Sequence, residues 1–337
     1  MSRHANAQPE GDALHPLRVG QGRAPGKVIL LGEHAVVYGW PAIALPVDRW
    51  VHVEVGPGNL VPTETDSGTL HGNTPPVSIR QLLSLAGSLL RLPAEHLAVR
   101  VNSAVPPGMG LGSSAALSVA LIRAIADYYG IALEDGDVSN CAYKLECLFH
   151  GQPSGVDNTA VALGSLLRFV RGKSPLPLSA PAPLPLVVLL GDQPRSTRTV
   201  VELLQRRREH DPQTVDASFA RIGQLAERAA AAIERGDWGI LAVTMNENQR
   251  ILHNLGVSTP EIDTLVAQAL TAGAWAAKVT GAGGGGAVVC LCPENRAAFV
   301  ERFLARGCQC FPVNWPPEDG GEHERYVAQS SISTERL

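Results

Sequence analysis

The stretch PPGMGLGSSAALSVALIRAIADYYG, residues 106–130, decides the fold of this 337-residue chain. From Ser113 onward its apolar residues follow helical spacing until a closing glycine, which predicts a mostly apolar helix. An extended segment, residues 97–105, comes before it, and three glycines between positions 108 and 112 separate the two. The sequence therefore predicts a strand, a glycine-rich turn and a helix in succession.

The glycine-rich turn is a candidate phosphate-binding loop. The first N–H groups of a helix have no internal partner and carry the positive end of the helix dipole, so they attract phosphate. Glycines let the backbone approach an anion, and the hydroxyl of Ser113 or Ser114 could ligate Mg²⁺. No Gly-Lys-Ser/Thr closes the loop, and Asp127 lies on the helix, so neither a Walker A motif nor a dinucleotide fingerprint is present. The alternative is an ordinary turn between a strand and a helix.

Two carboxylates flank a helix end in KLECLFHGQPSGVDN, residues 144–158. Glu146 lies on a helix predicted over residues 135–150. Asp157 follows a loop of Gly, Pro and Ser that could fold it back towards Glu146. Phosphoryl transfer uses one carboxylate to hold the metal and another to orient or deprotonate the acceptor hydroxyl. The alternative is a solvated helix face for Glu146 and a turn-forming role for Asp157.

The segment APGKVILLGEHAVVYG, residues 24–39, carries polar groups within an apolar run that predicts extended structure. Lys27 enters a buried strand and needs a negative partner, because an unpaired buried ammonium is costly. Pairing with Asp157 would keep that aspartate ionised and place positive charge near a transferred phosphoryl group. Glu33 and His34 are candidates for binding a polar substrate, or else for a buried salt bridge and a core histidine.

A second glycine-rich stretch, KVTGAGGGG at residues 278–286, lies between strands predicted over residues 276–280 and 287–292. Five glycines in six positions serve either a flexible linker or a turn that a ligand approaches closely. The stretch alone does not choose between these two interpretations.

The rest of the chain predicts two domains, because 337 residues are many for one core. The proline-dense residues 172–186 are the expected crossing between them. Residues 56–76 are a polar excursion with little core-forming content. A strand, loop, strand, helix and strand near the end indicate an α+β second domain. The other predicted elements are strands at 42–55, 186–191 and 308–313, and helices near 78–91, 198–208, 213–235, 238–254, 260–272 and 295–305.

Composition argues against several classes of protein. A net charge of −4 points to neither a nucleic-acid nor a membrane-surface partner. No apolar run is long enough to span a bilayer, and the polar opening does not resemble a secretion signal, so a cytoplasmic location is expected. The pairs Cys290/Cys292 and Cys308/Cys310 are expected to be reduced core residues of strands, with zinc ligation or disulfides as the alternatives.

Lysine is rare in this chain. Only four of the 28 basic residues are lysines: Lys27, Lys144, Lys173 and Lys278. A lysine inside a motif is therefore expected to serve through its compact ammonium group, since arginine meets the routine surface needs.

Together the three motifs resemble those of the GHMP small-molecule kinases, in the same order. APGKVILLGEHAVVYG is similar to their first motif, PPGMGLGSSAA to their second and KVTGAGGGGAVVCL to their third. The resemblance covers about residues 22–313 and is strongest to the mevalonate kinases. HGQPSGVDN at 150–158, RSTRTVV at 195–201 and HNLGVSTPEID at 253–263 add to it, with Gln152 where Asn is commoner.

The resemblance implies a role for each matching position. Asp157 would meet the acceptor hydroxyl, either as a general base or only by holding it, and Lys27 would pair with Asp157 and the γ-phosphate. Ser114 and Glu146 would hold Mg²⁺. The substrate site would be lined by Lys27, Glu33, His34, Asp157, Thr280, Gly281 and Ala282. The loop around the ATP phosphates would consist of Pro107, Gly108, Met109, Gly110, Leu111, Gly112, Ser113, Ser114 and Ala115.

The resemblance also implies an architecture and an activity. The fold would be α+β, with a ribosomal-S5-like domain at residues 17–175 and a ferredoxin-like domain at 176–315, flanked by disordered residues 1–16 and flexible residues 316–337. The chain would transfer the γ-phosphate of ATP, with Mg²⁺, to the 5-hydroxyl of mevalonate. This small-molecule substrate would be its partner, a homodimer stays open, and neither nucleic acid nor membrane is expected. The alternatives are a sibling kinase acting on phosphomevalonate, the mevalonate 3-hydroxyl or a sugar, and a non-catalytic regulator that binds nucleotide.

Overall fold

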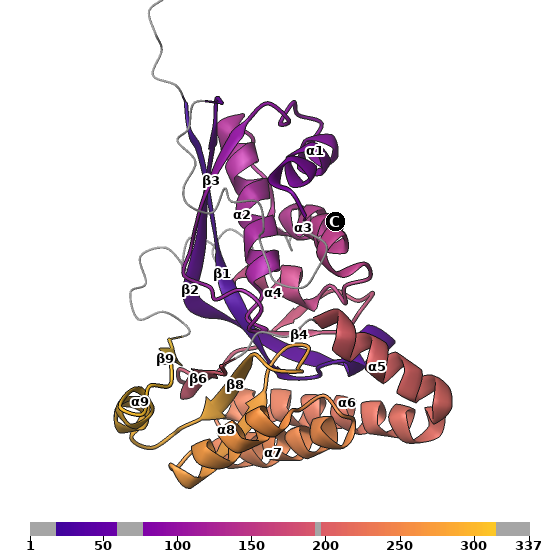
Figure 1. The fold of residues 1–337 in the computed structure, drawn as a ribbon, viewed down its shortest axis with the longest axis vertical. Coiled ribbons are helices and arrows are strands. Elements are labelled where there is room, and N and C mark those ends of the chain that lie inside the picture. Colours follow the sequence, from indigo (N-terminus) through magenta and orange to yellow (C-terminus); the bar gives the residue numbers. More distant parts are fainter. Residues whose placement is uncertain (1–17, 59–76, 193–196, 315–337) are drawn as a thin grey trace, which may run out of the picture.

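The computed structural model describes residues 18–58, 77–192 and 197–314. Both predicted tails and most of the polar excursion at 56–76 lie outside these ranges. The described residues form two antiparallel sheets, each packed against helices, and Figure 1 shows them as an upper and a lower half. The predicted α+β class is confirmed.

Among the described residues the first sheet has five strands, and β2 (Ala42–Gly56) is central. One edge of β2 pairs with β1 (Gly20–Leu31), and the other pairs with β3 (Ala98–Ser103) and β4 (Leu167–Phe169). The short strand β5 (Leu176–Pro177) pairs with β4. The last eight residues of β1 are all buried, so this strand carries the first motif into the interior.

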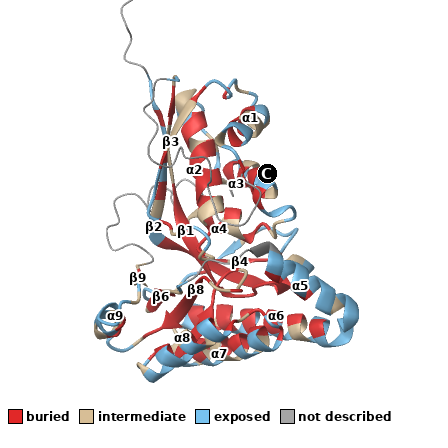
Figure 2. Cartoon of the chain, in the orientation of Figure 1, coloured by how far each residue is buried: buried red, intermediate tan, exposed pale blue. Residues whose placement is uncertain are grey.

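The helix α2 (Ser113–Tyr128) lies directly along β1. A Cβ at Gly20 would overlap the carbonyl oxygen of Ala124, and one at Gly22 would overlap that of Ala120. Glycine on the strand and alanine on the helix thus let the two backbones touch. Much of α2 and of β1 is buried, as Figure 2 shows in red. This contact fixes the start of α2, and with it the glycine-rich turn, relative to the first motif.

Three further helices pack with α2 in the upper half: α1 (Ile79–Leu90), α3 (Asp135–His150) and α4 (Val156–Leu163). The sequence predicts α1 and α3 within a residue or two. It predicts a loop where α4 begins, and it misses this helix. The segment before α4 is rich in Gly and Pro, and the helix starts only after Gly155, whose φ is +93°.

The expectation of extended structure through residue 38 is wrong. The chain turns at Gly32, where φ is +101° and a Cβ would overlap Ala42, so a side chain would not fit there. It then forms a 3₁₀ helix, η1 (Ala35–Tyr38). This turn lifts Glu33 and His34 out of the sheet towards the second half of the molecule.

The second sheet has the strand order β7-β8-β6-β9 in the described part of the chain, with all neighbours antiparallel. Its strands are β6 (Leu186–Leu190), β7 (Ala276–Val279), β8 (Ala287–Leu291) and β9 (Cys310–Val313). The chain leaves the first sheet after β5 and enters the second at β6, so the proline-dense segment makes the crossing.

The helices of the second half agree with the predicted ranges to within about two residues. Three of them begin at an Asp or Thr whose side chain accepts an N–H bond from the first turn, which is a strong helix start. None of the helices in the described ranges combines the length and apolar character that crossing a bilayer requires. The helices are α5 (Thr197–His210), α6 (Pro212–Arg235), α7 (Trp238–Asn254), α8 (Pro260–Thr271) and α9 (Arg296–Leu304).

The two halves share one apolar core. Val28 of β1, Leu225 of α6 and Val289 of β8 belong to the same cluster of buried residues. On α6, Phe219 stacks on Tyr38 with ring centroids 4.8 Å apart. This helix therefore packs against the first motif as well as its own sheet.

The cysteines follow the sequence prediction in part. All six are free; Cys290 and Cys292 are buried, as predicted. Cys308 and Cys310 are only partly buried, because Cys308 precedes β9 and Cys310 is its first residue.

Candidate active site

The Lys27 ammonium and the Asp157 carboxylate form an ion pair, with Nζ 2.9 Å from Oδ2. Lys27 comes from β1 and its side chain is 1% exposed, whereas Asp157, in the first turn of α4, is 35% exposed. Lys27 Nζ also donates to the carbonyl oxygen of Gly110, at 3.2 Å. The predicted pair is therefore formed, and its carboxylate remains accessible to a substrate.

The glycine-rich turn adopts a conformation that depends on its glycines. Gly108, Gly110 and Gly112 have φ values of +72°, +75° and +73°, in the left-handed region that other residues rarely enter. Gly112 is the N-cap of α2, so it offers no side chain to the first N–H groups of that helix. A Cβ there would lie 2.8 Å from Cγ of Lys27. The turn thus presents free helix N–H groups beside a buried ammonium, an arrangement suited to phosphate.

Ser114 on α2 faces Glu146 on α3, and its Oγ donates to Oε2 at 3.0 Å. Ser118 Oγ donates to the other carboxylate oxygen at 3.3 Å. His150, one turn after Glu146, has Nε2 3.1 Å from Ser114 Oγ. Glu146 is 1% exposed, and this burial, reinforced by the negative charge of Asp157, raises the pKa of the Glu146 carboxyl to about 8. The loop before α4 thus brings the two carboxylates close enough to interact.

The donors at Ser114 and Glu146 fit Mg²⁺. This ion takes oxygen ligands and is usually bound by one or two carboxylates together with substrate phosphates. A buried carboxyl with a raised pKa has lost hydration that a bound cation would replace, with release of the proton. In the described ranges, no group of three or more His, Cys, Asp and Glu side chains is arranged to hold a metal ion.

The third-motif turn packs against the phosphate loop, backbone to backbone. A Cβ at Gly110 would lie 2.6 Å from the carbonyl oxygen of Thr280, and one at Gly281 would lie 2.9 Å from Cα of Gly110. A Cβ at Gly286 would lie 2.9 Å from the carbonyl oxygen of Met109. The glycines of the second stretch therefore serve a turn held in close contact, and the linker alternative is wrong.

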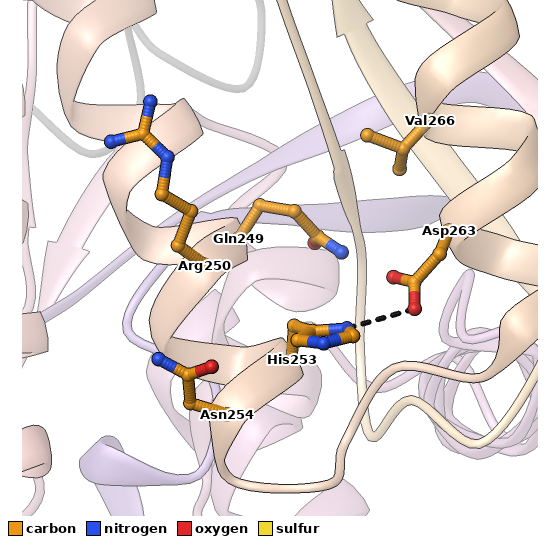
Figure 3. Close-up of a pocket in the computed structure, with 6 residues that line it drawn as sticks. All are labelled: Gln249, Arg250, His253, Asn254, Asp263 and Val266. Carbon is orange, nitrogen blue, oxygen red and sulfur yellow. Dashed lines mark hydrogen bonds and ion pairs between the residues drawn. The ribbon is translucent and has the colours of Figure 1, made fainter.

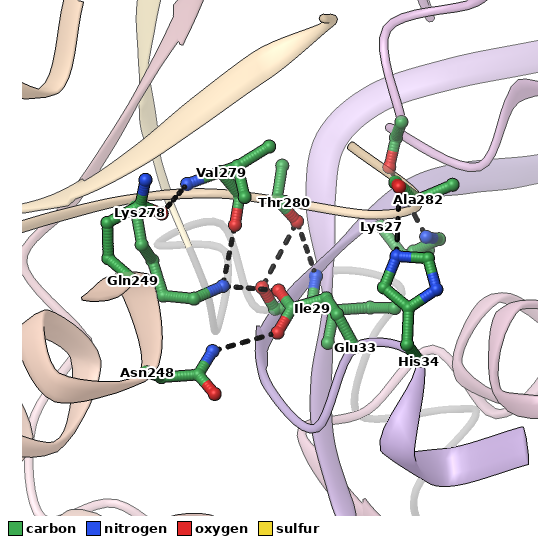
Figure 4. A network of polar contacts seen from close by, with 11 residues as sticks. Lys27, Ile29, Glu33, His34, Asn248, Gln249, Lys278, Val279, Thr280 and Ala282 are labelled. Carbon is green, nitrogen blue, oxygen red and sulfur yellow. Dashed lines mark hydrogen bonds and ion pairs between the residues drawn. The ribbon is translucent and has the colours of Figure 1, made fainter. Parts of the chain in front are cut away.

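Glu33 forms an ion pair with Lys278 between the two halves of the molecule (Figure 4). Both side chains are 0% exposed. Asn248 on α7 donates from Nδ2 to the second carboxylate oxygen at 3.1 Å, and Lys278 Nζ also donates to the Val279 carbonyl oxygen at 2.6 Å. Burial lowers the pKa of Lys278, and the charge of Glu33 opposes this shift. Of the two alternatives that the sequence leaves open for Glu33, the structure has the buried salt bridge.

His34 reaches the third-motif turn directly. Its Nε2 lies 2.9 Å from the carbonyl oxygen of Ala282. Because a carbonyl only accepts, Nε2 carries the proton and Nδ1 is left as an acceptor. Burial lowers the pKa of His34 to about 4, so the ring is neutral at pH 7. Its φ of +60° is strained for a residue with a side chain.

A separate cavity of about 310 Å³ lies between α7 and α8 (Figure 3). None of the side chains that line it belongs to the predicted site. His253 Nδ1 lies 2.8 Å from Asp263 Oδ2, and Ser258 Oγ donates to Asp263 Oδ1 at 2.6 Å. These bonds hold the turn between α7 and α8, which explains why His253, Ser258 and Asp263 lie together. The lining residues are Gln249, Arg250, His253, Asn254, Asp263 and Val266.

Sequence reasoning does not assign Lys278, Asn248 or His150 to the site. Lys278 carries a usable signal, since it is one of four lysines and begins the third motif. Asn248 carries none, because its contact with Glu33 depends on how α7 packs in the folded molecule. His150 lies in the segment 144–158, which the sequence analysis singles out for its carboxylates, one helical turn after Glu146.

The comparisons with known proteins agree with this geometry. The chain matches the family model of the GHMP kinases N terminal domain over residues 79–165 and that of the GHMP kinases C terminal over residues 229–310. The mevalonate kinase of Thermococcus gammatolerans is 33% identical over 311 residues, which cover 84% of this chain and 92% of the relative. The mevalonate kinase of Aeropyrum pernix is 36% identical over 301 residues, which cover 85% of this chain and 92% of the relative.

The fold of the chain also matches that of a solved mevalonate kinase structure. The L. major mevalonate kinase, crystallised in complex with R-mevalonate, is 26% identical and superposes with a TM-score of 0.75, covering 89% of this chain and 97% of that one. The two family-model matches include the phosphate loop with both carboxylates and the third-motif turn, respectively. With relatives this similar over most of both chains, the chain belongs to the mevalonate kinase family of the GHMP kinases.

Proposed function

We propose that this chain transfers the γ-phosphate of ATP to the 5-hydroxyl of mevalonate, giving 5-phosphomevalonate. The single observation that carries the proposal is the Lys27–Asp157 ion pair, whose ammonium also donates to Gly110 of the phosphate loop. It places an accessible carboxylate and a fixed positive charge beside the position expected for the transferred group.

Asp157 orients the acceptor. Its ionised carboxylate accepts a hydrogen bond from the 5-hydroxyl and aligns the oxygen with the γ-phosphate. Lys27 holds this carboxylate in place through the ion pair and presents positive charge to the phosphoryl group as it moves. Because the transition state of phosphoryl transfer is loose, little proton abstraction is needed before the bond forms. Positioning and charge therefore supply most of the catalysis.

The phosphate loop and the third-motif turn enclose the ATP phosphates from two sides. The free N–H groups at the start of α2 bind phosphate oxygens, and the glycines of both loops let the backbone come close. Ser114 and Glu146 would hold Mg²⁺, which would neutralise part of the phosphate charge when it is bound. The third-motif turn, packed against the phosphate loop, excludes water that would otherwise compete with the acceptor hydroxyl.

His34 and the turn Thr280–Ala282 line the acceptor side in this proposal. The neutral ring of His34 offers Nδ1 as an acceptor for a substrate hydroxyl. Glu33 lies behind this surface, because Lys278 and Asn248 occupy its carboxylate. In the described part of the site, Lys27 and Lys278 each pair with a carboxylate, which leaves neither free for an acceptor that already bears a phosphate.

The test is release of ADP from Mg-ATP, with mevalonate, phosphomevalonate, homoserine and galactose offered in parallel. Turnover on mevalonate alone, with the new phosphate on the 5-oxygen by ³¹P and ¹³C NMR, is the expected result. Phosphate on the 3-oxygen, or turnover on another acceptor, would overturn the substrate and keep the kinase. ATP binding without turnover on any acceptor would favour the non-catalytic alternative.

A further inference from the structure

Three contacts at alternate residues tie the start of the third motif to the first motif. Lys278 pairs with Glu33. The Thr280 hydroxyl accepts from the Ile29 N–H at 2.8 Å and donates to the Ile29 carbonyl oxygen at 3.1 Å. The next alternate residue accepts a bond from His34. We call these six residues the clamp: Ile29, Glu33, His34, Lys278, Thr280 and Ala282.

The alternation explains why one side of this segment faces the first motif. Side chains of an extended chain point to opposite faces at successive residues, so Lys278 and Thr280 share a face. The intervening Val279 N–H is bonded instead to Gln249 Oε1 of α7, at 2.9 Å. The segment is therefore held from both sides, by α7 and by the first motif (Figure 4).

The Glu33–Lys278 pair is the charged member of the clamp. Glu33 and Lys278 are separated by 245 residues in sequence and are both completely buried. Removing one partner would leave a buried charge without compensation, whereas removing both charges would not. The pair therefore resists any relative movement of the two segments that would separate these charges.

The clamp is linked through the third-motif turn to the phosphate loop and to Lys27. Thr280 and Gly281 pack against Gly110, and Gly110 accepts a bond from Lys27. A shift of the third-motif turn would therefore reach the phosphate loop and Lys27 without any change in those residues. Misplacing reacting groups by about 1 Å can slow an enzyme on the order of 100-fold.

We infer that Glu33 and Lys278 are positioning residues, which set where the Thr280–Ala282 turn lies against the phosphate loop, rather than groups that contact the acceptor. The kinetic part of this inference rests on the proposed function. If Glu33 instead binds the acceptor directly, it does not need Lys278 to do so. Substitution of Lys278 would then leave the kinetics normal, whereas the positioning role predicts that substitution of either residue lowers kcat.

The experiment is a double-mutant cycle in the full chain with Glu33→Gln, Lys278→Met and both together, measured as kcat and KM for each substrate. Each single variant is expected to lose kcat on the order of 100-fold. The double variant is expected to lose no more than the worse single one, because both changes release the same turn. A Glu33→Gln variant with raised acceptor KM beside a Lys278→Met variant with normal kinetics would overturn the inference. So would a double variant with wild-type kcat.

Hydrogen–deuterium exchange gives a readout that needs no substrate, so failure of the proposed function does not affect it. Amides of residues 280–286 are expected to exchange at least about tenfold faster in both single variants and in the double variant. Asp135→Asn is the matched control, because it breaks the Arg123–Asp135 pair inside the upper half and should leave these amides unchanged. Wild-type exchange of residues 280–286 in all three variants would overturn the inference.

Thr280→Val keeps the inference testable if the charge variants do not fold. It has nearly the same shape, leaves both buried charges paired and removes the two bonds to Ile29. Faster exchange of residues 280–286 with reduced kcat is expected. Wild-type exchange and kcat would show that the clamp does not set the position of the turn.

Discussion

At the scale of single residues, the most informative one is Asp157, because its role depends on its charge. In Asp157→Asn the ammonium of Lys27 loses its partner and the acceptor hydroxyl meets an amide. We expect kcat to fall on the order of 100-fold with ATP binding retained, because the acceptor oxygen is no longer aligned. Steady-state kinetics and calorimetric titration with nucleotide would measure both. Asp137→Asn, on an exposed turn of α3, is the control, and near-normal turnover of Asp157→Asn would show that the carboxylate has no catalytic role.

A second prediction at this scale concerns His34 and pH. Its folded pKa of about 4 lies below the ordinary value of 6.5, so the unfolded chain binds the extra proton first. This pKa difference contributes about 3 kcal/mol to the free energy of unfolding. The contribution is complete above pH 6.5 and is lost as the pH falls towards 4.

Urea unfolding at several pH values, in the wild type and in His34→Gln, would check this. The difference between the two proteins isolates His34 from the other titrating groups. We expect the wild type to lose more stability than the variant between pH 6.5 and 4.5. Parallel curves would mean that the ring takes up its proton over the same pH range in the folded and the unfolded chain.

The site residues show what sequence can and cannot predict at this scale. The Lys27–Asp157 pair was predictable, because a lysine in a buried strand must find a carboxylate. The partner of Glu33 was not, since it lies 245 residues away and the choice between substrate and salt bridge depends on how the two sheets meet. The sequence indicates which buried charged groups need partners more reliably than it indicates which residues those partners are.

At the scale of elements, the contact between the two glycine-rich turns can be tested separately from their backbone strain. Gly281 and Gly307 have nearly the same φ, +77° and +78°, but a Cβ at Gly281 would lie 2.9 Å from Gly110 whereas one at Gly307 would meet nothing within 4 Å. We expect each alanine substitution to cost about 1–2 kcal/mol of stability.

Only Gly281→Ala is then expected to reduce kcat, on the order of 100-fold, because it pushes the turn away from the phosphate loop. Chemical denaturation and steady-state kinetics on both variants would separate the two effects. Equal kcat in Gly281→Ala and Gly307→Ala would mean that close packing of these turns does not matter for catalysis.

The elements that the sequence missed share a cause. Long elements such as α2 and α6 are periodic over many residues and were predicted nearly to their ends. The short ones, η1, α4, β4 and β5, follow glycines at positive φ and hold too few residues to show a period. Their form depends on tertiary contacts, such as the stacking of Tyr38 on Phe219.

At the scale of the whole molecule, the shared core predicts one unfolding transition. Apolar residues of both sheets belong to a single cluster, and α6 contacts β1 and β2 as well as α7. We expect the two halves to unfold together in urea. Among the described residues, fluorescence would report on Trp40 and Trp50 in the first half and on Trp238 and Trp275 in the second, and circular dichroism would report on the helices.

Single-tryptophan variants would make this test sharp. A chain that keeps only Trp50 and one that keeps only Trp238 are expected to give superimposable curves, at the same midpoint as circular dichroism. Two midpoints that differ beyond error would mean that the halves unfold independently, in spite of the core they share.

The placement of the lysines has a practical consequence for handling the protein. Lys27 and Lys278 are buried in the site, whereas Lys144 and Lys173 are exposed on the upper half. Among these four lysines, reagents that couple to primary amines would therefore attach at the two surface positions. Immobilisation on a bead or a sensor chip through Lys144 and Lys173 would orient the molecule by its upper half and leave the Lys27 ammonium unmodified.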